Sequence, residues 1–550
     1  MTASPGTASL DYASPPDRGG IGGQPRGLTT LFFTEMWERF SFYGMKAILV
    51  LYTAAAISVG GLGFDNAHAG RIVGLYTSSV YLTPLIGGWI ADRLLGMRLA
   101  VLIGGIVIAC GHFSMACHSI TNFYAGLVLI ALGTGLLKPN ISSMVGQLYP
   151  QGDPRRDAGF SIFYMGINLG ALIAPLVCGF LAQAPAFKNF LSRHGMNPNN
   201  SWHWGFAAAG VGMIFGLVQY VMSGGRLKEV GARPKKARPA RVVETTDSRN
   251  SSPNGQLNST SPNTRPEEDA GDALSFTLAA VGAAIGVAVC FICGNRIHSW
   301  LDIVPFLLPA VLGIAFGYLI GVSRHLSRQE MGRVGAIFIL FVFSTIFWMS
   351  FEQAGTSLNL FADRLTRTTM FGYSFPSSWF QAVQPAFVIL LAPVFAWIWI
   401  TLGKRDLSSP AKFAIALVFA GLAFALVTYA SALTRGGTFL VSPWWLVGVY
   451  LLQTYGELCL SPVGLSTITK LSPGRLVGLM MGVWFLSTSL GDRIAGMVLT
   501  FFDEKDPRAL VTMFGSVTII SFVAASILFL LVPLIKKMIA TPAAGQSESA

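Results

Sequence analysis

Charged residues are scarce in this chain. Only 12% of its 550 residues are Asp, Glu, Lys or Arg, which is about half the fraction found in soluble globular proteins. Hydrophobic residues make up 52%, and many stand in runs of about 20, the length that crosses a bilayer as a helix. These proportions exclude a soluble globular protein and predict an all-α membrane protein with many spans.

Cysteine is rare as well, and six residues do not make a disulfide framework. Cys290 and Cys293 form a C-x-x-C pair inside an apolar run, and no second pair completes a zinc site, so we interpret them as packing residues. No Ser-His-Asp set or metal-ligand spacing is present, and Met1 to Arg26 lack the apolar run of a signal peptide. We therefore expect no enzyme, no metal and no cofactor.

Basic residues exceed acidic ones, 38 against 26. In a soluble chain this excess could indicate nucleic acid, but in a membrane protein it indicates cytoplasmic loops, so we expect no nucleic-acid partner. The side holding both termini carries sixteen Lys and Arg against nine on the other side, which predicts cytoplasmic termini. The fourteen candidate spans are residues 28–54, 68–91, 99–117, 122–148, 158–183, 203–223, 274–294, 300–322, 333–361, 379–402, 411–432, 442–469, 476–501 and 510–535.

The spans divide into two groups around a polar stretch rich in Pro, Ser and Asn. Such a composition cannot bury apolar surface, so we expect residues 224–273 to form a disordered cytoplasmic linker. The expected parts are a tail (1–27), a six-helix bundle (28–223), the linker, a peripheral two-helix hairpin (274–323), a second six-helix bundle (332–537) and a tail (538–550).

Ionisable residues stand inside several apolar spans. In the first span, Glu35, Glu38, Arg39 and Lys46 share one helix face. A charge at bilayer depth costs several kcal/mol unless it finds a partner or a polar cavity, so this face predicts a stripe that lines a cavity. A purely structural ion pair is the alternative.

Later spans repeat the pattern with Lys138, Glu352 and Glu457. Acids and bases drawn from both halves suit a proton-coupled carrier of a zwitterion. Carboxylates take up and release protons, cations hold the carboxylate of the substrate, and an anion holds its amine.

Three motifs carry a family resemblance. The first span resembles E-x-x-E-R-F-x-Y-Y, a later span resembles F-Y-x-x-I-N-x-G, and the loop after the second span resembles a conformational loop motif. Their residues are Glu35, Glu38, Arg39, Phe40, Phe42 and Tyr43; Phe163, Tyr164, Ile167, Asn168 and Gly170; and Gly88, Asp92, Arg93, Gly96 and Arg98. The chain thereby resembles the proton-coupled oligopeptide transporter family of the major facilitator superfamily.

The resemblance implies a fold of two six-helix bundles plus a hairpin, and symport of di- and tripeptides with protons by alternating access. It implies proton coupling by Glu35, Glu38, Arg39, Lys138 and Glu352. It implies a substrate site formed by Arg39, Tyr43, Lys46, Tyr81, Lys138, Tyr164, Asn168, Trp348, Gln384, Glu457, Ser461 and Trp484.

Within that set, the resemblance gives each end of the peptide its own partners. Arg39, Lys138 and Tyr43 would hold the peptide carboxylate, and Asn168 and Glu457 its amino terminus. Glu352 would compete with the substrate for Arg39.

Three positions depart from the family pattern. Phe42 and Gln384 replace the usual Tyr and Asn, which we expect to remove a hydroxyl from the site and to lengthen an amide arm. Asp492 replaces the usual Asn and adds a carboxylate whose role the pattern does not give.

The extra hairpin resembles that of bacterial members, so we expect a monomer in the bacterial inner membrane. A carrier of nitrate, another small anion or an amino-acid derivative, and a drug/proton antiporter, remain the alternatives.

Overall fold

The computed structural model describes residues 17–150, 153–232, 266–292, 304–370, 372–473 and 476–540. These residues are almost entirely helical. The strands β1 (Thr369–Met370) and β2 (Tyr373–Ser374) form a short antiparallel hairpin in which Thr369 lies opposite Ser374. The predicted tails at 1–16 and 541–550, the linker residues 233–265, Cys293 and the side chain of Cys290 lie outside the described residues.

The first half of the chain forms one bundle, called here the N bundle, which contains residues 17–232. Its helices are α1 (Arg26–Ala54), α2 (Asn66–Leu82), α3 (Pro84–Ile90), α4 (Met97–Met115), α5 (Ile120–Gln147), α6 (Arg156–Gln183), α7 (Pro185–Arg193) and α8 (Ser201–Met222). Short turns are η1 (Ile21–Gly23), η2 (Ile57–Val59), η3 (Ala91–Leu95), η4 (Pro198–Asn200) and η5 (Gly224–Leu227). The turn η5 lies within the range predicted as linker.

The second half forms the C bundle, residues 328–540, with a helical hairpin before it. The hairpin is α9 (Pro266–Ile292) and α10 (Val304–Ser323), so α9 also begins inside the predicted linker range. The C bundle contains α11 (Arg328–Phe351), η7 (Glu352–Gly355), α12 (Ser357–Arg364), η8 (Ser377–Ala382), α13 (Val383–Leu402), η9 (Gly403–Arg405), α14 (Ser409–Leu433), α15 (Trp444–Leu471), α16 (Val477–Val498), η11 (Leu499–Phe501) and α17 (Pro507–Ile539).

A helix overlaps each of the fourteen predicted spans. By length and apolar composition alone, eight of the helical stretches in the described ranges are able to cross a membrane. Helix α1 is not one of them, because each 18-residue stretch of it holds more than the two charged residues that such a span carries. The same charges mark the helix as one that faces a polar interior.

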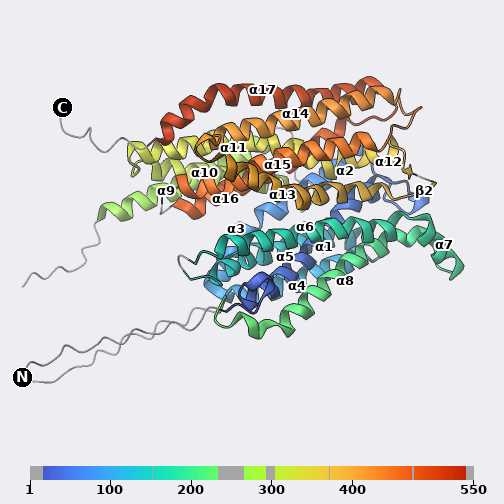
Figure 1. The fold of residues 1–550 in the computed structure, drawn as a ribbon, viewed down its shortest axis with the longest axis horizontal. Coiled ribbons are helices and arrows are strands. Elements are labelled where there is room, and N and C mark those ends of the chain that lie inside the picture. The colour runs from blue at the N-terminus through green and yellow to red at the C-terminus, as the bar shows by residue number, and fades with distance from the viewer. Residues whose placement is uncertain are drawn as a thin grey trace, which may run out of the picture.

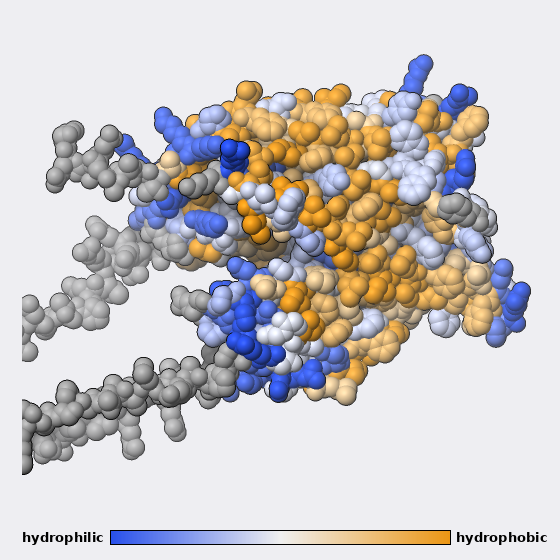
Figure 2. All heavy atoms as spheres, in the orientation of Figure 1, coloured by the Kyte–Doolittle hydropathy of each residue, from blue (hydrophilic) through white to orange (hydrophobic). Residues whose placement is uncertain are grey.

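The two bundles lie side by side with their helices roughly along the long axis of the molecule (Figure 1). Helix α1 begins and α17 ends at one end, called here the inner end, which the sequence analysis predicts to be cytoplasmic. The opposite end, near α7 and β2, is called the outer end. On the face that Figure 2 shows, apolar side chains cover the middle of both bundles, polar ones gather toward the two ends, and a recess separates the bundles at the inner end.

Contacts between the bundles concentrate toward the outer end. Asn66 at the start of α2 donates to the carbonyl oxygen of Phe502 over 2.8 Å, and Gln183 at the end of α6 donates to the Ser377 hydroxyl over 2.9 Å. One buried core joins the N bundle to Leu358 and Phe361 of α12, among others, while a second core fills the inner half of the C bundle and contacts the hairpin. The structure is therefore closed at the outer end.

Glycine allows α2 and α16 to pack with their backbones in contact. A methyl group added at Gly70 would lie 2.3 Å from the carbonyl oxygen of Gly496. Any side chain at Gly70 would thus push the bundles apart at the outer end.

Gly70→Leu is expected to shift the protein away from this outer-closed arrangement, because overpacking of this kind costs about 1–3 kcal/mol. Spin labels on Asn189→Cys (α7) and Ala432→Cys (α14), in a chain freed of its own cysteines, should report a longer distance between the outer ends. Gly478→Leu on α16 is the matched control, since a methyl group there meets no atom within 4 Å. An unchanged distance in Gly70→Leu would show that this contact does not hold the outer end closed.

Candidate functional site

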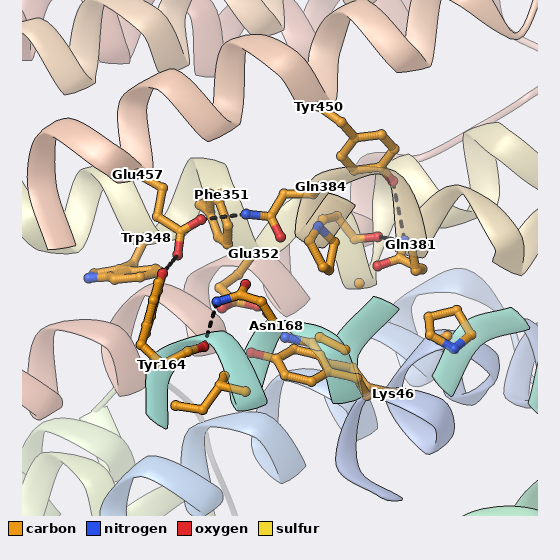
Figure 3. Close-up of a pocket in the computed structure, with 18 of the residues that line it drawn as sticks. Lys46, Tyr164, Asn168, Trp348, Phe351, Glu352, Gln381, Gln384, Tyr450 and Glu457 are labelled. Atoms are coloured by element: carbon orange, nitrogen blue, oxygen red, sulfur yellow. Dashed lines mark hydrogen bonds and ion pairs between the residues drawn. The ribbon is translucent and has the colours of Figure 1, made fainter. Parts of the chain in front are cut away.

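A cavity lies between the two bundles, and its volume is about 840 Å³, including the part that opens to solvent. It is lined by Tyr43, Lys46, Ala47, Tyr81, Tyr164, Ile167, Asn168, Ala171, Pro175, Trp348, Phe351, Glu352, Ala354, Gly355, Gln381, Gln384, Pro385, Tyr450 and Glu457. Figure 3 shows that these side chains come from helices of both bundles and point toward one another. The structure thus brings together eight of the twelve predicted substrate-site residues, along with Glu352.

One side of the cavity is built around the carboxylate of Glu457, on α15. Gln384 on α13 donates a hydrogen bond to its Oε2 atom, and the Tyr164 hydroxyl on α6 donates to Oε1 over 3.5 Å (Figure 3). Asn168, one turn further along α6, donates to the Tyr164 carbonyl over 3.0 Å. A carboxylate has about four lone-pair sites, so Glu457 has room to accept a further donor such as an ammonium group.

A buried ion pair crosses from one bundle to the other. Lys46 of α1 donates to Glu352 of η7, and both residues are buried, at 8% and 6% exposure. Nearby, Asn359 of α12 donates to the Ala47 carbonyl over 2.8 Å. We predicted that Glu352 competes with the substrate for Arg39; in this structure the ion-pair partner of Glu352 is Lys46.

Glu352 occupies a break in its helix. Helix α11 ends at Phe351, residues Glu352–Gly355 form a tighter 3-10 turn, and α12 begins at Ser357 after Thr356 leaves the helical conformation. Such breaks expose backbone groups at bilayer depth and are tolerated where the helix lines a cavity.

Three charged residues of α1, Glu35, Glu38 and Arg39, form a separate cluster outside the cavity lining. The Nε atom of Arg39 donates to Glu38 and lies 3.2 Å from Glu35 Oε1, and none of these three residues lines the cavity. Of the four charged residues that we expected to line the cavity, only Lys46 does so. Glu35 Oε2, Glu38 Oε1 and Arg39 Nη2 have no hydrogen-bond partner in the described residues.

Phe42 lies between Arg39 and Lys46 of α1. Its ring centroid lies 5.1 Å from the Arg39 guanidinium carbon and 5.8 Å from Lys46 Nζ, and its side chain is fully buried. We expected that Phe42, in place of Tyr, would remove a hydroxyl group from the substrate site. The structure instead places this side chain between Arg39 and Lys46, and the face of its ring attracts both cations.

Lys138 does not line the cavity itself, and within the described part of the chain it forms no ion pair. Its ammonium nitrogen lies 4.2 Å from the ring centroid of Tyr81, which lines the cavity. It interacts electrostatically with Glu35, Glu38 and Arg39. The predicted substrate residues Ser461 and Trp484 do not line the cavity, and the Trp484 ring packs in the core against Phe413.

Sequence reasoning missed three polar or aromatic wall residues. Gln381 of η8 donates to the Tyr450 hydroxyl over 3.2 Å and to the Ala354 carbonyl over 2.5 Å, and Phe351 lies beside Trp348. Gln381 could have been predicted as a wall residue, because it is an amide in the same short segment as Gln384. Tyr450 and Phe351 carried none, because single aromatic residues are common in membrane spans.

The conformational loop motif holds the start of the segment that follows α8. Gly96 ends η3 with a positive φ of 79°, and Arg98 at the start of α4 then donates to the carbonyl oxygens of Val230, over 2.6 Å, and Lys228. The Arg98 amide also donates to the Gly231 carbonyl over 3.1 Å. Gly88 lies in α3, and Asp92 and Arg93 are exposed on η3.

A further ion pair lies on the inner surface, outside the membrane-spanning helices. Arg155 Nη2 lies 2.8 Å from Asp153 Oδ2, and this hydrogen-bonded pair lowers the pKa of the Asp153 carboxyl below its usual value. Arg155 also donates to the Asp17 carbonyl over 3.0 Å. The segment before α1 is thereby held against the loop between α5 and α6.

The model of the POT family matches residues 98–515 of this chain. The chain belongs to the POT family. It is therefore a multi-pass membrane protein of a transporter family and not an enzyme.

Similar proteins cover nearly the whole chain. "Uncharacterized transporter YclF" of Bacillus subtilis (strain 168) is 41% identical over 94% of this chain and 96% of its own length. "Di-/tripeptide transporter" of Lactococcus lactis subsp. cremoris is 36% identical over 94% and 97%. A solved structure, "Crystal structure of peptide transporter POT in complex with sulfate", is 38% identical, with a TM-score of 0.76 over 95% of this chain and 97% of the other. The predicted fold class and family are thus confirmed.

Proposed function

We propose that this POT-family protein is a symporter that takes up di- and tripeptides together with protons. The observation that carries the proposal is a cavity between the bundles with a carboxylate, Glu457, and a cation, Lys46, in its walls. A short peptide is a zwitterion whose two ends match these charges. Peptide transport by relatives, including the Lactococcus protein, supports the same substrate class.

The amino terminus of the peptide would bind at Glu457. Its ammonium group would add to the bonds from Gln384 and Tyr164, and the Asn168 side chain lies one turn from Tyr164. The carboxylate of the peptide would turn toward Lys46 and Tyr43 in the wall and toward Lys138 next to it. Arg39 would join only after it has left Glu35 and Glu38.

Proton binding would act on the ion pair between the bundles. A proton on Glu352 removes its negative charge, frees Lys46 for the substrate and cancels a contact that ties α1 to η7. A proton on the Glu35–Glu38 cluster would free Arg39 in the same way. Release of the proton on the inner side would restore the ion pair and expel the peptide.

Alternating access would then be a rocking of the two bundles about the cavity. The structure corresponds to the state closed at the outer end. Moving one elementary charge inward across 100 mV gains about 2.3 kcal/mol, which would support roughly fiftyfold accumulation of peptide per proton. We propose further that the protein acts as a monomer in a bacterial inner membrane, with both termini cytoplasmic.

Uptake of labelled dialanine into proteoliposomes under an inward proton gradient tests the proposal. We expect accumulation that disappears when a protonophore collapses the gradient, and competition by other di- and tripeptides. Nitrate, free amino-acid derivatives and cationic drugs should compete poorly. The absence of gradient-dependent accumulation for every di- and tripeptide tried would refute peptide symport, and strong competition by nitrate would favour an anion carrier instead.

A further inference from the structure

Helix α7 lies at the outer end, beside the N bundle, and turns away from the direction of α6 (Figure 1). The turn falls at Ala184, which is extended, and Pro185 then starts the new helix, because a proline does not allow the residue before it to continue α6. The 28 residues of α6 are about 42 Å long, which matches the thickness of a bilayer with its headgroups, about 40–45 Å. Since α6 spans the bilayer, α7 starts at the level of the outer headgroups.

The nine residues of α7 form an amphipathic helix. Phe187, Phe190 and Leu191 share one face; the two rings are stacked with 6.0 Å between their centroids, and Leu191 is fully buried. The opposite face is polar and carries Lys188 and Arg193. A helix with aromatic residues on one face and cations on the other is typical of one that lies in the plane of the membrane interface.

The aromatic residues around α7 continue the surface that faces lipid. The Phe187 ring lies 6.3 Å from that of Phe180 on α6 and 6.1 Å from that of Trp204 on α8. Trp204 is 43% exposed and Phe190 48%. The exposed side chains further along α6 and α8 are also apolar, among them Ile173, Val177, Val211, Phe215 and Val218. The ring cluster is therefore the outer edge of a lipid-facing surface, the depth at which aromatic residues gather.

The charge of this region favours an anionic partner. Residues 158–228 contain no Asp or Glu, so the segment around α7 carries cations alone. Arg193 is exposed, lies one helical turn from Phe190, and forms no ion pair with any of the described residues. Lys188, on the other edge of the polar face, is partly buried. A guanidinium group pairs with phosphate through two hydrogen bonds, and a cation without acidic neighbours attracts a headgroup with net negative charge most strongly.

We propose that α7 lies in the outer headgroup layer and binds an anionic phospholipid. The phosphate contacts Arg193, and the upper part of the acyl chains covers the rings of Phe190 and Trp204. Lys188 adds attraction at the other edge of the helix. The bound lipid holds the connection between α6 and α8 at a fixed depth in the membrane while the bundles rock.

Binding of phosphatidylglycerol to the full-length protein in detergent, followed by native mass spectrometry, tests the headgroup contact. The wild type should bind phosphatidylglycerol more tightly than phosphatidylcholine. Arg193→Gln should weaken phosphatidylglycerol binding about fivefold, the effect of one basic residue near an anionic surface, and Arg193→Lys should weaken it less. Arg508→Gln is the matched control, because Arg508 is exposed at the outer end of the C bundle next to Asp506. Equal affinity for both lipids, or unchanged binding in Arg193→Gln, would overturn the proposal.

Fluorescence quenching tests where the rings lie. The chain has 12 Trp residues, so the signal of Trp204 is the emission that Trp204→Phe removes. In liposomes of phosphatidylglycerol, bromine near the headgroup should quench this emission more strongly than bromine at the chain ends. Trp202→Phe is the control, because Trp202 is buried and its emission should be quenched little. A Trp204 signal that no brominated lipid quenches would place α7 in water and refute the proposal; if Trp204→Phe fails to fold, the binding assay still decides it.

Discussion

Glu352→Gln is expected to lower gradient-driven peptide accumulation at least tenfold while peptide counterflow at equal pH continues. Glutamine keeps the shape of the side chain and its hydrogen bond to Lys46, but it cannot carry a proton. The measurement is uptake of labelled dialanine into proteoliposomes with and without a gradient, beside exchange against unlabelled peptide inside. The two assays separate coupling from binding.

The control for this variant is Glu504→Gln. Glu504 also forms an ion pair, with Arg364 over 2.9 Å, but it lies at the outer end and outside the cavity. The Glu504→Gln variant should give accumulation and counterflow within about twofold of the wild type, as expected for a partly exposed ion pair. Loss of counterflow as well in Glu352→Gln would make Glu352 a substrate ligand or a structural residue.

Glu457→Gln should weaken the apparent affinity for dialanine by about 30-fold or more. It removes the negative charge that would meet the peptide ammonium group, and losing one partner of a buried charged pair costs about 2 kcal/mol or more. The measurement is the concentration of unlabelled dialanine that halves counterflow. Proton-driven uptake at saturating peptide should fall much less.

An N-acetylated dialanine serves as the matched substrate control. The wild type should discriminate strongly against it, because it has no ammonium group for Glu457, whereas Glu457→Gln should bind both peptides with similar affinity. Equal discrimination by wild type and variant would show that the peptide amino terminus binds elsewhere. It would also leave Glu457 as a structural acceptor for Gln384 and Tyr164.

The sequence predicted the helices well, because runs of apolar residues long enough for a membrane have few alternatives. It also identified the residues with unusual chemistry, since an acid or a base inside an apolar run is conspicuous. Eight predicted substrate residues line one cavity although they come from six different helices. A family motif supplied the uncharged ones, such as Asn168, which composition alone would not have marked.

The partners of the charged residues could not be predicted from the sequence. Arg39 and Lys46 lie on one face of α1, so either could have met Glu352, more than 300 residues away. The choice depends on how far α1 and η7 slide past each other, which is a property of the packed bundles. The directions of the Ser461 and Trp484 side chains could not be predicted either. They depend on how α15 and α16 are rotated about their axes, which the spacing of residues in the sequence does not give.

Arg98 donates hydrogen bonds to backbone carbonyl groups in the stretch Lys228–Gly231. These bonds fix the point where the connection to α9 leaves the N bundle. Because three backbone carbonyl groups accept hydrogen bonds from this one residue, we expect the stretch after α8 to move together with the start of α4, as one piece with the N bundle.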